Sequence, residues 1–312
     1  MPKRVLIYTF IMILLWGSHF PVATLTMKAR EIEPLSSHAL LFHTLLLAAP
    51  CLFLIMLFTG RLRELKRYSW AHLAKLVFAG VFGYFFYYAF LFAAGARALP
   101  VDAVAEAAII NYLFPMCTLL ASAAIIGEKL TARALVSGLI CLGGAYVVVC
   151  RGDFTRVTFS HPWIDLFALL AAVSWGIFSA LGRRWKHEPL TGMFIFIMTG
   201  LVISGLVLRF TGGRRYPVGW EFYGAFHVGF ICNTVGVILW FQALKHGGAS
   251  LVGNLALLTA FVNLLFIRIL LPGQTIHWTA VVGLVIIILG VLLSRTAKRV
   301  PAAIPELTEP LG

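Results

Sequence analysis

The chain has 312 residues, of which 61% are hydrophobic and only 12% are charged. Soluble domains carry about 25% charged residues, so this composition excludes an ordinary water-soluble fold. The formal net charge of +13 does not indicate nucleic-acid binding, because the lysines and arginines lie in short clusters between apolar stretches, where they are typical of membrane topology signals.

Apolar stretches of about 20 residues recur along the chain, and this is the length that an α-helix needs to cross a bilayer. A backbone in hydrocarbon must satisfy its polar groups within helices or a closed barrel. The sequence therefore predicts an all-α, polytopic membrane protein with ten transmembrane helices. In chain order, the expected spans cover residues 5–27, 36–59, 71–95, 103–126, 134–150, 163–182, 190–209, 221–244, 250–271 and 277–294.

The two ends of the chain are distinct from the spans between them. The N-terminal MPKR precedes an apolar stretch that continues to Met27 without a small-residue cleavage site, so we expect a retained first span and not a signal peptide. Residues 300–312 are polar and rich in proline, and we expect a flexible tail there. The five cysteines lack metal-ligand spacing, so we predict packed thiols and no metal or other cofactor.

The positive charges indicate how the spans are oriented. With the N-terminus inside, sixteen of the 25 lysines and arginines fall on the inner side and nine on the outer side. Cytoplasmic loops carry the excess of such residues, so we expect both termini in the cytoplasm. Arg209, Arg214 and Arg215 run against this bias.

Two segments of the chain resemble each other. The WG pair at 16–17 in the first span recurs at 175–176 in the sixth, 159 residues later. The AL pair at 98–99 recurs at 243–244, an offset of 145, and the same offset relates Gly138 to Gly283. The chain therefore divides into two repeats of five spans, residues 1–152 and 153–299. Because five is odd, the second repeat is inverted, and inverted repeats are typical of transporters with a site between the halves near the midplane.

The residues that carry this pattern resemble a known family. The two WG pairs and the run ALPVDAVAEAAIINYLFPMCTLLASAAIIGEKL at 98–130 are similar to the EamA-type, ten-helix members of the drug/metabolite transporter superfamily, over about residues 5–295. The family typically shows a proline halfway through the fourth span and a glutamate opening the next loop, here Pro115 and Glu128. The second half departs from this pattern, with Ala260 and Gly273 in the corresponding positions.

The resemblance also implies a function and a location. The aromatic-rich third span is most like that of the aromatic amino acid exporters, which implies an amino acid or a related metabolite as the substrate. The resemblance further implies the bacterial inner membrane, with the lipid bilayer and a small molecule as partners and no nucleic acid.

The third span contains YFFYYAFLF at 84–92. At helical spacing, Tyr84, Tyr87, Tyr88 and Leu91 share one face. A tyrosine hydroxyl is costly in hydrocarbon without a partner, so this face turns either to a water-filled cavity or to neighbouring helices that bond the hydroxyls. The phenylalanines expected on other faces are Phe85, Phe86 and Phe92.

Two tryptophans occupy equivalent places in the two halves. Trp16 and Trp175 lie near the middle of their spans, away from the interface where tryptophan is enriched. They form either two walls of a substrate pocket or a packed core beside the following glycines.

Ionisable residues inside spans are candidates for function. Glu106 has small neighbours, so its carboxylate either faces an aqueous pathway or pairs with Arg97. His19 precedes Pro21, which disturbs local backbone bonding. The imidazole of His19 either binds a substrate carboxylate and relays protons, or packs as a satisfied core histidine.

Mid-span amides complete the candidate set. Asn111 and Asn254 lie in the fourth span of each half, and Asn233 lies in the eighth span. We expect these three to contact substrate, although amides in membranes also simply join helices. The expected substrate-binding residues are therefore Trp16, His19, Tyr84, Tyr87, Tyr88, Glu106, Asn111, Trp175, Asn233 and Asn254.

These features favour a secondary transporter that exports aromatic or hydrophobic amino acids by alternating access around a central, aromatic-lined cavity. A carrier for nucleotide sugars or other organic anions is the alternative, but it would need basic residues inside the spans, where Arg268 is an isolated example. No nucleophile, metal-ligand or P-loop motif is present, so the sequence predicts neither an enzyme nor direct ATP coupling.

Overall fold

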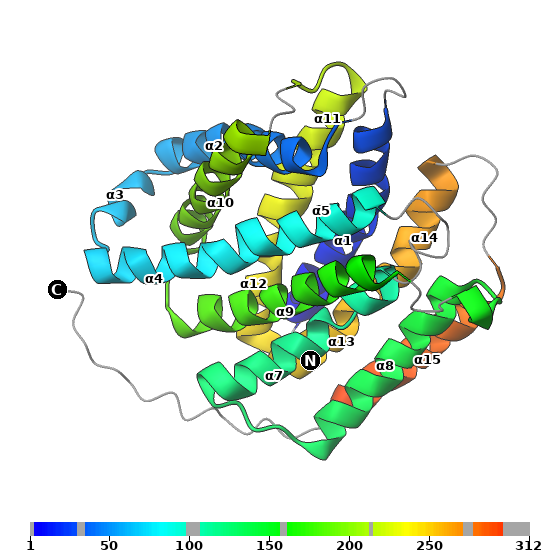
Figure 1. Ribbon diagram of the computed structural model, residues 1–312. Coiled ribbons are helices and arrows are strands. Elements are labelled where there is room, and N and C mark those ends of the chain that lie inside the picture. Colours follow the sequence, from blue (N-terminus) through cyan, green and yellow to red (C-terminus); the bar gives the residue numbers. More distant parts are fainter. Residues whose placement is uncertain are drawn as a thin grey trace.

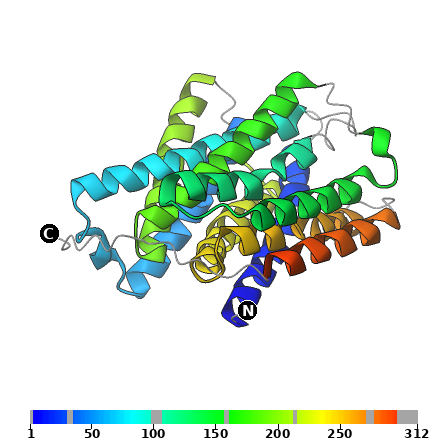
Figure 2. The same cartoon turned by 90° about the horizontal axis from the view of Figure 1, so that it is seen from below.

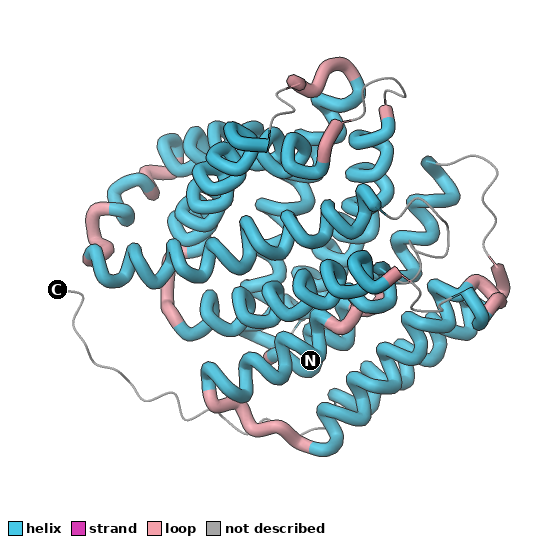
Figure 3. Tube along the Cα trace, viewed as in Figure 1, coloured by secondary structure: helices cyan, strands magenta, loops and turns pink. Residues whose placement is uncertain are grey.

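The computed structural model describes residues 3–29, 35–97, 107–156, 161–211, 215–270 and 277–295. Within these residues every regular element is a helix, as the tube drawing in Figure 3 shows. Nine of the described helices are long and apolar enough to cross a membrane, and a tenth apolar helix, Thr279–Ser294, is shorter. The prediction of an all-α membrane protein is therefore confirmed. Glu106 and the expected tail at 300–312 lie outside the described residues.

The first five spans and their connections are built from these elements: α1 (Lys3–Lys28), α2 (Ser37–Phe58), α3 (Leu62–Leu65), α4 (Trp70–Gly80), η1 (Val81–Phe86), α5 (Tyr87–Arg97), α7 (Phe114–Ile126) and α8 (Ala132–Cys150). The next five are built from η2 (Phe154–Arg156), α9 (Pro162–Arg184), α10 (Pro189–Thr211), α11 (Trp220–Phe226), η3 (His227–Val235), α12 (Gly236–Gly247), α13 (Ala249–Ala256), α14 (Thr259–Leu270) and α15 (Thr279–Arg295).

Helix ends follow ordinary capping chemistry. At the start of α2, the Ser36 hydroxyl accepts a hydrogen bond of 3.1 Å from the amide of Ala39. At the start of α8, the Thr131 hydroxyl accepts a hydrogen bond of 3.1 Å from the amide of Ala134. A Ser or Thr in this position satisfies one of the amides that the first turn leaves without an intrahelical partner. Gly127 ends α7 in the left-handed conformation, with φ of 82°, which suits a residue without a Cβ.

One π-helical segment interrupts the third span of each half of the chain. The segment η1 lies between α4 and α5, and η3 lies between α11 and α12. Such segments are rare and occur frequently at functional sites. Here η1 carries Tyr84 and η3 carries Asn233, two of the residues that the sequence singled out.

The helices α8 and α15 form the most extensive helix pair, and they lie side by side in both Figure 1 and Figure 2. Their backbones approach closely where Gly144 faces Gly283. A Cβ on Gly144 would lie 2.7 Å from the Gly283 carbonyl oxygen and 2.8 Å from the Ile287 amide nitrogen. Glycine is common at such crossings because membrane helices associate through close packing and gain no hydrophobic driving force. Glycines at this crossing therefore allow α8 and α15 to approach closely.

The remaining spans surround a common centre. The helix α1 packs against α12 and α14, α9 packs against α7 and α5, and α2 packs against α10. In Figure 1, α9 and α12 lie near the middle of the molecule, beside the lower part of α1. The largest fully buried side chains, Trp175 and Trp240, come from α9 and α12.

We predict that Gly144→Leu lowers the thermal stability of the detergent-solubilised protein, because its side chain forces α8 and α15 apart. Overpacking of this kind costs about 1–3 kcal/mol. The neighbouring Gly143→Leu is the matched control, because a Cβ there meets no atom within 4 Å. Both changes alter helix propensity equally, so equal melting temperatures for the two variants would contradict the prediction.

Candidate functional site

An aromatic cluster occupies the centre of the bundle. Its rings come from both halves of the chain and are linked by ring contacts with centroids 4.6–6.5 Å apart. Edge-to-face and tilted geometries of this kind are those that aromatic quadrupoles favour. We use the name aromatic cluster for Trp16, Tyr84, Tyr87, Tyr88, Phe114, Trp175, Phe178, Phe196 and Trp240.

Three tryptophans form the middle of this cluster. Trp16 and Trp175, predicted from their equivalent positions, meet edge-to-face with centroids 5.3 Å apart and an interplanar angle of 82°. Trp240 lies 5.4 Å from Trp16 and 6.2 Å from Trp175. The equivalent tryptophans therefore face the interior and contact each other.

The indole N–H groups of these tryptophans are satisfied unequally. Trp16 Nε1 donates to the Cys232 carbonyl at 3.2 Å, and Trp240 Nε1 donates to Ser179 Oγ at 3.0 Å. Trp175 is 2% exposed, and its buried Nε1 has no acceptor among the described residues. Trp175 thus presents an unused donor at the centre of the cluster.

The three tyrosines contact one another as the helical spacing indicated, and the hydroxyl of Tyr84 is bonded within the protein. Tyr84 is fully buried, and its hydroxyl donates to the backbone carbonyl of Asn233, beside Met193 Sδ at 2.9 Å. This bond joins η1 to η3, so the Tyr84 hydroxyl serves helix packing. Tyr87 lies 4.6 Å from Trp175 and 4.8 Å from Tyr88.

Phe92 does not follow the expected pattern. It was expected on another face than the tyrosines, yet its ring lies 5.9 Å from Tyr88 and stacks on His19 at 6.0 Å. Ordinary helical spacing accounts for this, because Phe92 is four residues after Tyr88 within α5 and therefore shares its face. Phe86, in contrast, stacks on Phe90 at 5.7 Å, away from this contact.

His19 and Asn233 bring further unsatisfied polar atoms to the cluster. His19 lies against Tyr88 at 5.9 Å and next to Asn233 and His227. Among the described residues, its buried Nε2 has no partner within hydrogen-bond geometry, although the Asn233 side chain lies close enough to interact with the ring. The side chain of Asn233 is 1% exposed, and apart from this approach to His19 its amide nitrogen and oxygen meet no partner in the described part of the chain.

The other two amides have different roles. Asn111 lies next to Tyr87, and in the described part of the chain its buried Oδ1 has no donor. Asn254 is hydrogen-bonded instead to a neighbouring span, with Nδ2 donating to Ser137 Oγ at 2.9 Å. The structure therefore brings Asn111 to the cluster, while Asn254 joins α13 to α8.

The polar atoms without partners in the described structure indicate which groups a ligand could present to the cluster. A buried polar group without a partner costs about 1–3 kcal/mol. Around the cluster, Trp175 Nε1 and Asn233 Nδ2 are donors, whereas Asn111 Oδ1 and Asn233 Oδ1 are acceptors. Aromatic walls with a few convergent polar groups are the usual composition of a small-molecule site.

Several members of the site were not predicted. The cluster is completed by Phe114, Phe178, Phe196 and Trp240. Ser18 and His227 lie beside it, joined by a hydrogen bond of 2.8 Å. Trp240 gave no usable signal in the sequence, because it lies only four residues from the end of its expected span, 221–244. The repeat gave no support for it, because Gly95 stands at the corresponding position of the first half.

An ion pair links the two halves at one end of the bundle. Arg183 at the end of α9 pairs with Glu128, which lies just beyond α7, and donates to Ser122 Oγ at 3.3 Å. Arg184 donates to the Ile125 carbonyl beside them. Glu128 is the glutamate that the family resemblance pointed to, and its partner comes from the other half.

Comparison with known proteins identifies the family. The model of the EamA-like transporter family matches residues 3–150 and 162–296. The chain belongs to this family. It is accordingly a membrane transporter with homologues in bacteria, and its several apolar helices indicate an integral membrane protein.

Individual relatives of this EamA-like transporter are distant. The chain is 27% identical to aromatic amino acid exporter YddG of Ancylobacter novellus over 57% of this chain and 60% of that exporter. It is 26% identical to an uncharacterized protein of Pseudomonas aeruginosa over 95% of this chain and 98% of that protein. One crystal structure of another protein shares the fold, with a TM-score of 0.76, 23% identity, and coverage of 94% of this chain and 98% of that chain.

We predict that Tyr84→Phe destabilises the transporter by about 1–3 kcal/mol, because it leaves the Asn233 carbonyl buried without a donor. The apparent melting temperature in detergent measures the effect. Phe85→Leu, a change at a half-buried neighbour in η1, is the control for altered aromatic packing. If Tyr84→Phe melts at the wild-type temperature, the hydroxyl does not join η1 to η3.

Proposed function

We propose that this transporter exports aromatic or other hydrophobic amino acids and binds them at the aromatic cluster. The observation that carries the proposal is the coincidence, at one buried place, of aromatic rings from both halves and of donors and acceptors without protein partners. The name of the relative from Ancylobacter novellus, an aromatic amino acid exporter, supports the same substrate class.

The polar atoms complement a zwitterion. The donors Trp175 Nε1 and Asn233 Nδ2 suit a carboxylate, and the acceptors Asn111 Oδ1 and Asn233 Oδ1 suit an ammonium group. An aromatic side chain of the substrate would gain edge-to-face contacts with the tryptophans, and its ammonium would gain a cation–π contact. In the described spans, Arg268 lies near the end of α14, and the cluster itself is built from neutral side chains, which does not suit a polyanion such as a nucleotide sugar.

We further propose that the chain consists of two inverted repeats that rock about this site. Close contacts related by the repeat offsets support this. A Cβ on Gly17 would lie 2.9 Å from Val262 Cβ, and a Cβ on Gly176 would lie 2.6 Å from the Cys117 carbonyl carbon. These contacts are equivalent at the offsets of 159 and 145 that relate the sequence motifs. The matching of the family model to two segments of similar length agrees with this division.

In this mechanism the site opens alternately to each side of the membrane. The positive-inside bias supports cytoplasmic termini in a bacterial inner membrane, which places the Glu128–Arg183 pair on the cytoplasmic side. There it would hold the two halves together when the site faces outward.

We predict that reconstituted vesicles transport labelled tryptophan or phenylalanine faster than glutamate or a sugar. Asn233→Ala should raise the KM for tryptophan about tenfold, the effect of losing about 1.4 kcal/mol of binding. Asn263→Ala, at a half-buried amide of α14, should leave KM unchanged. Transport of another metabolite but of no amino acid would refute the substrate class.

We also predict that Glu128→Gln and Arg183→Gln each change the transport rate, while the double variant changes it no further than either single variant. Non-additivity is expected because the two residues act as one contact. Rates measured in the same vesicles give the coupling, and strictly additive effects would show that the pair does not act as a unit in transport.

A further inference from the structure

A cavity of about 460 Å3 lies beside the aromatic cluster, between α1, α14 and the segment formed by α11 and η3. None of the nine rings of the aromatic cluster lines it. Its volume falls within the range of about 300–1,000 Å3 typical of small-molecule sites. The cavity is therefore a second place, distinct from the cluster, that is large enough for a metabolite.

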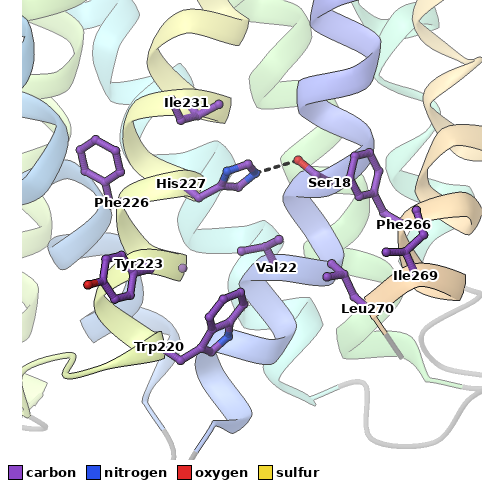
Figure 4. Close-up of a pocket in the computed structure, with 11 residues that line it drawn as sticks. Ser18, Val22, Trp220, Tyr223, Phe226, His227, Ile231, Phe266, Ile269 and Leu270 are labelled. Atoms are coloured by element: carbon purple, nitrogen blue, oxygen red, sulfur yellow. Dashed lines mark hydrogen bonds between the residues drawn. The ribbon is translucent and has the colours of Figure 1, made fainter. Parts of the chain in front are cut away.

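The walls of the cavity are apolar and its inner end is polar. Figure 4 shows Ser18 of α1 and His227 of η3 pointing toward each other, joined by a hydrogen bond of 2.8 Å. Val22, Phe266 and Leu270 supply apolar surface around this pair. The cavity thus combines a hydrophobic body with one hydrogen-bonding end, the pattern of a site for an amphiphile.

The polar pair has bonding capacity to spare. Ser18 Oγ donates its hydrogen to the Leu15 carbonyl at 2.7 Å. Because a hydroxyl has a single hydrogen, the His227 Nε2 then donates to Ser18 Oγ, and a neutral ring keeps Nδ1 as an acceptor. A ligand with a donor group, such as an ammonium or an indole N–H, finds a partner there. A lipid acyl chain would instead place a methyl group against this pair.

The position of the pair connects the cavity to the aromatic cluster. Ser18 precedes His19 on α1, and His227 neighbours His19 from η3. The Ser18–His227 pair therefore lies next to His19, a residue that contacts Tyr88 of the aromatic cluster. With cytoplasmic termini, the cavity lies toward the outer half of the membrane, because the far ends of α1 and α14 and the start of α11 share that side.

We propose that this cavity is a second binding site for the exported amphiphile on its way out, with the polar end on Ser18 and His227 and the ring against Val22, Phe266 and Leu270. This inference rests on the proposed function, since it assigns the same substrate to a later position. It predicts two bound substrate molecules per chain at saturation.

The test is equilibrium dialysis of labelled L-tryptophan against the full chain in nanodiscs. His227→Ala should weaken the second site about tenfold in Kd. Ile269→Trp should fill the cavity and abolish the second site, and it should fold normally because Ile269 is 72% exposed. Leu206→Trp is the matched control, since it adds the same ring at an exposed leucine of α10 outside the cavity and should retain two sites.

The outcomes separate this inference from the proposed function. Two sites in the wild type and in Leu206→Trp, but one in Ile269→Trp, support it. One bound tryptophan in every protein contradicts the second site but not the central site. No binding of tryptophan to the wild type contradicts both proposals. A phospholipid seen by native mass spectrometry on the wild type and lost in Ile269→Trp would identify the occupant as lipid and also overturn the inference.

Discussion

Hydrocarbon offers no partner to a polar group, so each hydroxyl, amide and carbonyl at the centre of this transporter must be satisfied by another part of the chain or by what it carries. The bond from the Tyr84 hydroxyl to the Asn233 carbonyl meets this requirement for the backbone. It links the two π-helical segments, which belong to the third and eighth spans. The rings around it then pack in the remaining space, and Trp16 contacts Trp175 across the two halves.

The same requirement separates structural from functional polar groups. Asn254 and Ser137 satisfy each other, as do the Trp240 indole and Ser179, and these pairs hold spans together. The Asn233 amide is 1% exposed and approaches only the His19 ring, and among the described residues it has no partner within hydrogen-bond geometry. Retaining such a group costs stability, which is reasonable where a substrate supplies the missing bonds.

Much of this architecture could be predicted from the sequence, because hydropathy and span length are properties of the chain alone. Nine expected spans correspond to long helices of the described residues, and the tenth corresponds to the shorter Thr279–Ser294. Trp16 and Trp175 could be paired because a repeated dipeptide marks them. Phe114 and Trp240 could not, because their place in the cluster depends on how helices rotate against each other, which a single sequence does not record.

The place of Phe92 follows from ordinary helical spacing. Phe92 is four residues after Tyr88 within the regular helix α5, so the two rings share a face, and the π-helical segment η1 ends before both of them. A change of phase in η1 turns Tyr88 and Phe92 together. From η3, His227 and Asn233 lie near His19 of α1, a placement that no pattern of apolar residues predicted.

The link between Glu128 and Arg183 has a consequence for the energetics of the proposed cycle. The first half carries this acidic residue, whereas the position that corresponds to it in the second half is Gly273. A duplicated protein with identical halves would have two end states of equal free energy. In the proposed cycle the pair would stabilise closure at one end, and the sequence has no carboxylate at position 273 to do the same at the other. The resting population would then favour one orientation of the site.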